Sequence, residues 1–477
     1  MTPAAEPGQD ARPRRRGLLR VLGASEGAAI GIGVAIGAGI FRTPGYVASF
    51  LDAPWKILAA WFVGGLFVLG DCLILAELAT RMPRAGGWYV YIEKGLGRFP
   101  AFVYGWTYML VVDPASSAAL VVVLSEYLGS LLQIGPTGGR IAGIGVTTGL
   151  FCLSLAGVRF GARVQDALTY TKLLALVAIG VLALFAAPAA VLSGVPSAPH
   201  ALPAAAPGAL AGLLAFGLAL QGVLWTFEGY ANTTTMTEES VDPRRTIPRA
   251  LVFGAMALGA TYLLVNGAYL HVLGRDGLAA SALPGADLFA QVFGGAGGRI
   301  FVLVAILAAL GSLNGAALSA PRVAYALARS GLAPEPLTRV TRLGTPDLAT
   351  LWFAVGWGLY AWFGSFEGLV SVSIFIGALC NVAVTATLFA HRRRDRRTAA
   401  GETGAARARH AGAGSRAVFL SPLYPWLPIV MLILWIAFAA DVLYDQGWKV
   451  GYGLLATAIA ASAYLWLNRR WTAGEGA

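Results

Sequence analysis

The sequence GIGVAIGAGIFRTPG occupies residues 31–45, inside the first long apolar run of a 477-residue chain. Gly31, Gly33, Gly37 and Gly39 are followed by Pro44. Each glycine is less favourable than alanine in a helix interior by about 1 kcal/mol. Glycine also lets the chain unwind, so that a ligand can approach bare amides. The stretch therefore predicts a break in the first membrane span, although small residues also serve close helix packing.

A second interruption, QGVLWTFEGYANTTT, occupies residues 221–235, about 190 residues later. It places Glu228, Gly229, Asn232 and three threonines in an otherwise apolar run. A carboxyl group at that depth is costly and indicates function by default; the alternative is a structural hydrogen bond to another helix. Corresponding interruptions in two halves are typical of inverted-repeat transporters with a site at the bilayer midplane.

The composition defines the class of protein around these motifs. Hydrophobic residues make up 57% of the chain, charged residues make up 12%, and the mean hydropathy is +0.68. A soluble domain carries about 25% charged residues, so a cytosolic enzyme or a nucleic-acid binder is a poor interpretation. Three scattered cysteines in apolar stretches exclude a disulfide framework or a zinc site. The chain is predicted to be an all-α integral membrane protein.

Twelve apolar runs are long enough to approach or exceed the roughly 20 residues of a membrane helix. We expect two five-span halves, with spans one and six discontinuous, followed by two further helices. The third, sixth and eighth runs exceed a straight crossing, which predicts tilt, a break or an extension. The runs are 25–49, 54–79, 99–132, 140–157, 167–190, 208–236, 249–273, 299–328, 349–364, 367–390, 424–443 and 449–467.

The distribution of basic residues predicts the orientation. With the N-terminus inside, 28 of the 35 Lys and Arg residues lie on the cytosolic side, six lie outside, and Lys172 lies within a span. This asymmetry favours a topology with both termini in the cytosol. We expect the protein in the inner (cytoplasmic) membrane of the cell. The predicted segments are a disordered basic N-terminus (1–20), a ten-helix core (21–394), a flexible loop (395–420), the last two helices (421–468) and a tail (469–477).

The broken spans suggest a ligand by electrostatics. N-terminal ends of half-helices offer unpaired N–H groups to an anion, and C-terminal ends offer carbonyls to a cation. A zwitterion with adjacent carboxylate and ammonium groups fits both ends, so α-amino acids suit this geometry.

Lys172 lies in the apolar fifth span, after Gln165 and Asp166. A buried amine must pair, lose its proton or contact carbonyls. It can stand where another transporter would hold a sodium ion, or it can titrate and couple transport to protons. Snorkelling toward the cytosolic interface is the alternative.

Several motifs, in order, resemble the amino acid–polyamine–organocation (APC) permeases, over roughly residues 22–395. The eighth-span motif is most similar to the L-type amino acid exchangers and their bacterial relatives. The motifs are GAGIFRTPG (37–45), AELATRMPRAGGWYVYIEKGLGRFPAFVYGW (76–106), GVRFGARVQDALTYTKLLAL (157–176), EESVDPRRTIPRA (238–250) and GSLNGAALSAPRVAYALARSGLAP (311–334).

The resemblance implies roles for two sets of residues. The first would present amides to a substrate carboxylate: Gly37, Ala38, Gly39 and Ile40. The second would supply carbonyls to the amino group and shape the side-chain pocket: Trp225, Thr226, Phe227, Glu228 and Gly229. Trp225 matches an aromatic that stacks on substrate in one branch of the family, and plain packing is the alternative.

The resemblance also implies how transport is coupled. Lys172 matches a fifth-span lysine, which implies a sodium-independent mechanism, and Ser312 is the expected eighth-span partner of its ammonium. Spans one, two, six and seven would rock against three, four, eight and nine. Glu228 departs from the common pattern: it could pair with cationic substrates, serve coupling when protonated, or anchor a helix.

The sequence thus predicts an L-amino acid transporter working by exchange or proton symport, with a polyamine or organic-cation transporter as the alternative. An enzyme, a channel and a metal carrier are weaker interpretations, because no catalytic pair, filter-like run or acid and methionine cluster on spans one and six is present. We expect no cofactor and no metal. The second outside loop (133–139) has no cysteine, so we expect no disulfide-linked heavy subunit of the eukaryotic kind.

Overall fold

The computed structural model describes residues 17–186, 209–401, 418–447 and 451–474, and in these ranges the chain is helical without a β-strand. The first half comprises α1 (Ala24–Ala35), α2 (Gly39–Phe50), α3 (Pro54–Arg81), α4 (Trp88–Leu96), α5 (Arg98–Thr107), η1 (Tyr108–Val112), α6 (Asp113–Leu132), α7 (Pro136–Leu155) and α8 (Val158–Leu184). The second half comprises α9 (Ala209–Phe227), η2 (Tyr230–Glu239), α10 (Pro243–Ala280), α11 (Pro284–Phe293), η3 (Gly294–Ala296), α12 (Gly297–Ser319), α13 (Pro321–Arg329), η4 (Glu335–Thr338), α14 (Asp347–Phe363) and α15 (Phe366–Gly401). Two more helices follow, α17 (Trp426–Gln446) and α18 (Gly451–Gly474).

The helices confirm a multi-span membrane protein. Among the described residues, nine helices are long and apolar enough to cross a membrane, and the bent pair α1 and α2 makes a tenth. Each of the twelve predicted runs contains a helix. The count of twelve spans stays a prediction, because α14 has 17 residues and the apolar part of α18 is also short.

All three runs that are longer than a straight crossing carry an irregularity. The third contains the π-helical turn η1, just before Pro114. The sixth changes at Gly229 from α-helix to the 3₁₀-helix η2. The eighth is divided into α12 and α13 at Pro321, because the backbone nitrogen of proline has no hydrogen to donate. The extra residues therefore serve breaks and turns.

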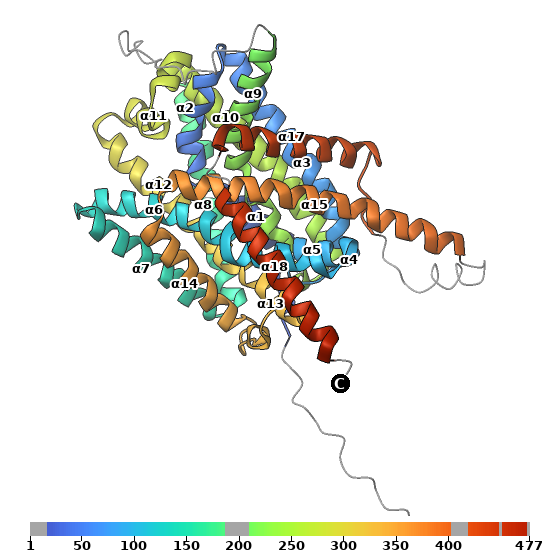
Figure 1. The fold of residues 1–477 in the computed structure, drawn as a ribbon. Coiled ribbons are helices and arrows are strands. Elements are labelled where there is room, and N and C mark those ends of the chain that lie inside the picture. Colours follow the sequence, from blue (N-terminus) through green and yellow to red (C-terminus); the bar gives the residue numbers. More distant parts are fainter. Residues whose placement is uncertain (1–16, 187–208, 402–417, 448–450, 475–477) are drawn as a thin grey trace, which may run out of the picture.

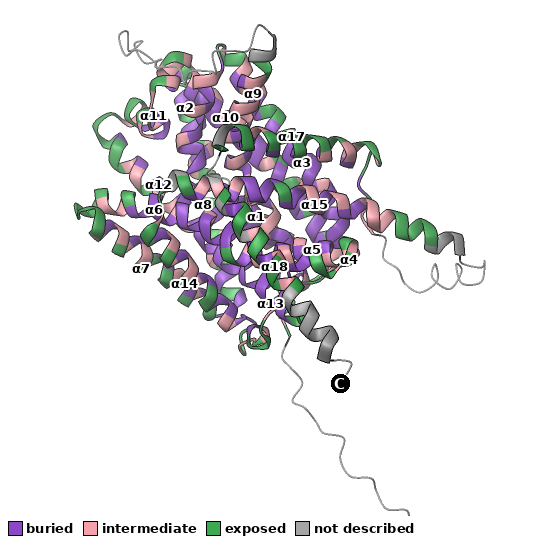
Figure 2. Ribbon diagram, in the orientation of Figure 1, coloured by how far each residue is buried: buried purple, intermediate pink, exposed green. Residues whose placement is uncertain are grey.

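α1 lies near the middle of the helical bundle (Figure 1) and packs against α10. α10 packs along α3 and α1, while α2 lies beside α9, so that the broken helices of the two halves are neighbours. The buried residues concentrate on these central helices, and exposed residues lie along α7, α14 and α17 (Figure 2). An exposed apolar rim around a buried centre is what a surrounding bilayer requires.

The loop predicted over 395–420 begins later than expected. α15 continues through Gly401, because residues 392–400 are mostly good helix formers such as Arg and Ala. Arg81 also pairs with Asp395, at 2.5 Å. Ser421 is already buried, and its amide donates to Glu77 (2.7 Å). Residues 1–16 and 402–417, which cover most of the predicted disordered N-terminus and of the predicted flexible loop, lie outside the described residues.

Candidate functional site

The first break separates α1 from α2. α1 ends at Ala35, Ile36 leaves the helical conformation (φ −75°, ψ 82°), and α2 resumes at Gly39 with a bend of 51°. The first amides of a resumed helix have no acceptor in the preceding turn. The break predicted from the glycines is therefore present.

The second break lies between Phe227, where α9 ends, and the 3₁₀-helix η2. Gly229 holds it open with φ at +117°, a conformation that L side chains rarely adopt. A Cβ on Gly229 would lie 2.7 Å from Val34 Cγ1 and 2.8 Å from the Ala35 amide nitrogen. Only a glycine lets the second break approach the backbone of the first this closely.

One hydroxyl joins the two breaks. Tyr262 on α10 lies with its Oη 2.9 Å from the carbonyl oxygen of Ala35 and 3.0 Å from that of Thr226. The Thr233 hydroxyl makes a second link by donating to Gly27 O at 2.8 Å. The sequence reasoning missed Tyr262, because nothing in an apolar span marks which tyrosine reaches a broken backbone.

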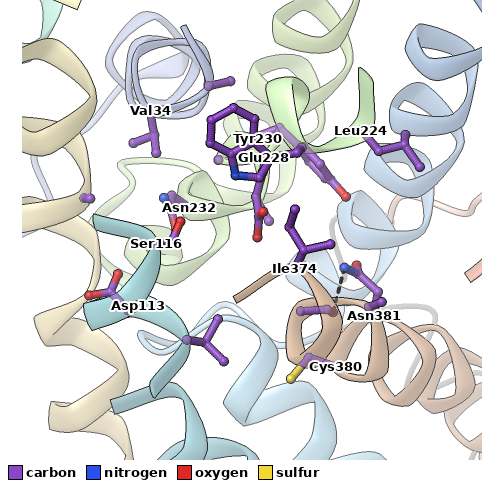
Figure 3. Close-up of a pocket in the computed structure, with 18 of the residues that line it drawn as sticks. Val34, Asp113, Ser116, Leu224, Glu228, Tyr230, Asn232, Ile374, Cys380 and Asn381 are labelled. Carbon is purple, nitrogen blue, oxygen red and sulfur yellow. Dashed lines mark hydrogen bonds between the residues drawn. The ribbon is translucent and has the colours of Figure 1, made fainter. Parts of the chain in front are cut away.

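A cavity of about 150 Å³ opens between the breaks and is bordered by α6, α15 and α17 (Figure 3). Seven of the nine residues predicted to bind substrate line it: Gly37, Ala38, Gly39, Trp225, Thr226, Glu228 and Gly229. Two do not. Ile40 is fully buried, with its carbonyl accepting from Tyr269 (3.2 Å), and Phe227 packs against Trp61 and Tyr262. Both support the cavity wall from behind.

Lys172 lies directly behind the first break and is fully buried. Its Nζ contacts the carbonyl oxygen of Gly33, that of Ile36 at 2.7 Å and that of Ala308 at 3.2 Å. These carbonyls form a site suited to a cation, here called the cation site, and the Lys172 amino group fills it. The side chain does not snorkel toward an interface.

Ser312 completes this cation site from α12. Its hydroxyl lies 3.4 Å from Lys172 Nζ, 3.1 Å from Gly33 O and 3.0 Å from Ile36 O. The structure thus brings Ser312 together with Lys172, as expected, and places both outside the cavity lining.

A polar row on α8 extends the same contact. Gln165 and Thr169 both lie within hydrogen-bond distance of Ala29 O, at 3.3 and 2.9 Å, one turn before Lys172 reaches Gly33 and Ile36. Spacings of four and three residues place these side chains on one helix face. α8 therefore contacts three carbonyls of the first span, those of Ala29, Gly33 and Ile36.

Glu228 lies in the cavity at the second break, pointing into the open space (Figure 3). Its carboxylate has no hydrogen bond or ion pair with any described residue. Asp113 on α6 also lines the cavity, but its oxygens accept from Trp357 Nε1 (2.8 Å) and Tyr108 Oη (3.3 Å). Sequence reasoning missed Asp113, although a carboxylate in an apolar run was a signal for it.

Behind the second break, Tyr230 is held by a buried acid. Its hydroxyl donates to Asp71 at 2.7 Å, and Trp435 Nε1 on α17 lies 3.4 Å from the same carboxylate. Trp435 and Phe438 line the cavity. α17 is thus part of the cavity wall, which was not expected of the final pair of helices.

These features define a class: a helical membrane protein in which two discontinuous spans face each other across a cavity, with a buried lysine amino group in the cation site. Residues 22–460 match a family model described as amino acid permease. The chain therefore belongs to the amino acid permease family, in the APC superfamily.

Individual relatives agree with this assignment. The chain is 25% identical to the serine/threonine exchanger SteT of Bacillus subtilis (strain 168), over 95% of this chain and 98% of that protein. It is 28% identical to the human b(0,+)-type amino acid transporter 1, over 77% and 75% of the two chains. It is 29% identical to the human cystine/glutamate transporter, over 71% and 66%.

Proposed function

We propose that this protein is a sodium-independent secondary active transporter of L-amino acids in the cytoplasmic membrane. The observation that carries the proposal is the pair of backbone breaks facing each other across a cavity of about 150 Å³. The relatives, named as amino acid transporters and exchangers, support the substrate class.

The substrate would bind through peptide groups. Its carboxylate would accept from the amides of Ala38 and Gly39 at the start of α2, where the helix dipole favours an anion. The Gly37 amide, which in this structure donates to the carbonyl oxygen of Ala35 at 2.8 Å, would join them by releasing that carbonyl. Its ammonium would contact the carbonyls that end α9, at Trp225 and Thr226. Both charges of a zwitterion are then satisfied without an ionic side chain.

Sodium independence rests on Lys172. The carbonyls of Gly33, Ile36 and Ala308 form the kind of oxygen site that a cation prefers, and the Lys172 amino group occupies it. When protonated, this amino group would supply the charge that sodium supplies elsewhere and hold the first break in its binding conformation. Exchange and proton symport differ in the role of Lys172. In proton symport it would gain and lose the coupling proton during transport, and in exchange it would not.

Alternating access would proceed by rocking. The bundle of spans one, two, six and seven moves against three, four, eight and nine, and substrate shifts the balance by binding one state better. In the proposed orientation both termini are cytosolic. We expect no obligate heavy subunit.

A polyamine or organic-cation transporter is the second candidate, and the observation that favours it is the unpaired carboxylate of Glu228. An organic dication without a carboxylate would leave the amides of the first break unused, whereas an amino acid uses both breaks. The amino acid proposal therefore accounts for more of the site.

The test is a binding panel of the twenty amino acids, putrescine and spermidine, read as a shift in melting temperature of the purified protein. A bound ligand stabilises the native state by mass action, by about 2.7 kcal/mol at 100 times Kd. Stabilisation by amino acids with no sodium present supports the proposal. Stabilisation by polyamines alone, or a requirement for sodium, would contradict it.

A further inference from the structure

Two acceptors without donors lie at one end of the cavity. The first is the Glu228 carboxylate. It lies against α15 at Gly377, where a Cβ would meet Glu228 Oε1 at 3.5 Å. The absence of a side chain at Gly377 keeps this approach open.

The second acceptor is Asn381, one turn further along α15 and also on the cavity wall (Figure 3). Its Nδ2 donates to the carbonyl oxygen of Gly377 at 3.1 Å. This bond fixes the carboxamide, because the opposite flip would set two oxygens against each other. Asn381 is only 6% exposed, and its Oδ1 has no hydrogen-bond partner.

The cavity offers no donor of matching charge. Among the described residues that line it there is no Lys, Arg or His. Asp113 is the other acid, and it already accepts two hydrogen bonds. The ammonium of Lys172 is held by the carbonyls of the cation site. A carboxylate inside the cavity and a buried amide oxygen are both costly when no donor faces them. The donor that this end of the cavity lacks can come from the ligand.

We propose that Asn381 is a specificity-determining residue, whose Oδ1 acts together with the Glu228 carboxylate to bind a positively charged group on the substrate side chain. The inference rests on the proposed function, because the two breaks hold the α-carboxylate and α-ammonium. An ammonium brings three donors and a guanidinium five, so one side-chain cation satisfies both acceptors. A neutral side chain leaves both unsatisfied.

The test compares L-lysine, L-arginine and L-leucine binding to purified protein by isothermal titration calorimetry. The wild type is expected to prefer L-lysine and L-arginine to L-leucine. In Asn381→Leu the preference is expected to fall roughly tenfold, through weaker binding of the cationic amino acids while L-leucine is unaffected or tighter. In Asn381→Asp the preference is expected to be kept or increased, because the acceptor remains.

Asn266→Leu is the matched control. Asn266 on α10 repeats the same local arrangement, with Nδ2 donating to the carbonyl of Tyr262 four residues earlier at 2.8 Å and Oδ1 unpartnered. It is fully buried and does not line the cavity. The substrate preference in this variant should match the wild type.

Three results would overturn the inference. The first is an unchanged preference in Asn381→Leu, or in Asn381→Asp a loss as large as the one expected for leucine. The second is a wild type that binds L-leucine but neither cationic amino acid, which would leave amino acid transport standing. The third is a wild type that binds none of the twenty amino acids, which would remove the proposed function as well. If Asn381→Leu fails to fold, Asn381→Ala provides the same comparison, because alanine also lacks an acceptor.

Discussion

Lys172 is the residue on which the proposed sodium-independent mechanism depends. A lone ammonium in the bilayer interior is expensive, and here it is satisfied by backbone carbonyls that a helix would otherwise keep for itself. The carbonyls of Gly33 and Ile36 are available because α1 unwinds at Ile36. The break and the lysine therefore stabilise each other, and removing the charge leaves the carbonyls of Gly33 and Ile36 without their main donor.

Lys172→Ala should lower L-amino acid uptake into proteoliposomes by on the order of tenfold or more, because charged hydrogen bonds of about 1.5–3 kcal/mol are lost. The protein should still insert and purify as a folded species. Lys94→Ala, at an exposed position on α4, is the control. Wild-type uptake in Lys172→Ala would remove the lysine from the mechanism.

Tyr262 and Tyr269 provide a second comparison, both on α10 and both fully buried. Tyr262→Phe removes the hydroxyl that lies between Ala35 O and Thr226 O, and unsatisfied groups of this kind cost about 1–3 kcal/mol. Tyr269→Phe removes a single, longer bond to Ile40. We expect Tyr262→Phe to lower the melting temperature and uptake more than Tyr269→Phe. Equal effects would show that the link between the two breaks is unimportant.

At the scale of elements, the second break is a conformational requirement. η2 begins after Gly229, whose positive φ turns the chain from α-helix into a 3₁₀-helix against Val34 and Ala35. The polar row of α8 plays the matching part for the first break. Each broken helix is thus held open by a different device, a glycine in one half and a set of side-chain donors in the other.

Gly229→Ala should abolish uptake and lower the melting temperature, because the backbone strain of about 1–3 kcal/mol adds to contacts under 3 Å. Gly267→Ala is the matched control, since nothing lies within 4 Å of a Cβ at this position in the interior of α10. There alanine should stabilise the helix by about 1 kcal/mol. Full uptake in Gly229→Ala would mean that the break tolerates an ordinary helical residue.

At the scale of the whole molecule, α17 completes the cavity wall that the preceding helices form. It contributes Trp435 and Phe438 to the cavity, and the residues before it contribute the Ser421 amide to Glu77. Glu77 also binds Arg81 and Arg392, so α3, α15 and the start of this segment meet at one buried carboxylate. In the proposed alternating-access cycle, the rocking helices would therefore slide past α17 or move together with it.

Trp435→Ala should lower both the melting temperature and uptake, since truncating a buried tryptophan leaves a void and removes the Nε1 bond to Asp71. Tyr464 on α18 packs on Phe99 and Phe102, away from the cavity. Tyr464→Ala should lower the melting temperature, but uptake per folded protein should fall less than in Trp435→Ala. The opposite order of effects would argue against a transport role for α17.

The sequence was sufficient to predict both helix breaks, because glycines are unfavourable inside a helix and stand out in an apolar run. It also paired Lys172 with Ser312, through the family resemblance. It could not distinguish Ile40 and Phe227 from the cavity-lining residues beside them, since side-chain direction depends on where each helix stops. It missed Tyr262, Asp113 and Trp435 because their roles come from packing between distant spans.

The most direct measurement is an experimental structure of the protein with a bound amino acid identified by the binding panel. The account predicts the ligand between the two breaks, with its carboxylate about 2.7–3.2 Å from amide nitrogens of residues 37–39. Its ammonium should lie at a similar distance from the carbonyls of Trp225 and Thr226, with Lys172 still in the carbonyl site. A ligand bound elsewhere, or continuous helices through Ile36 and Glu228, would contradict it.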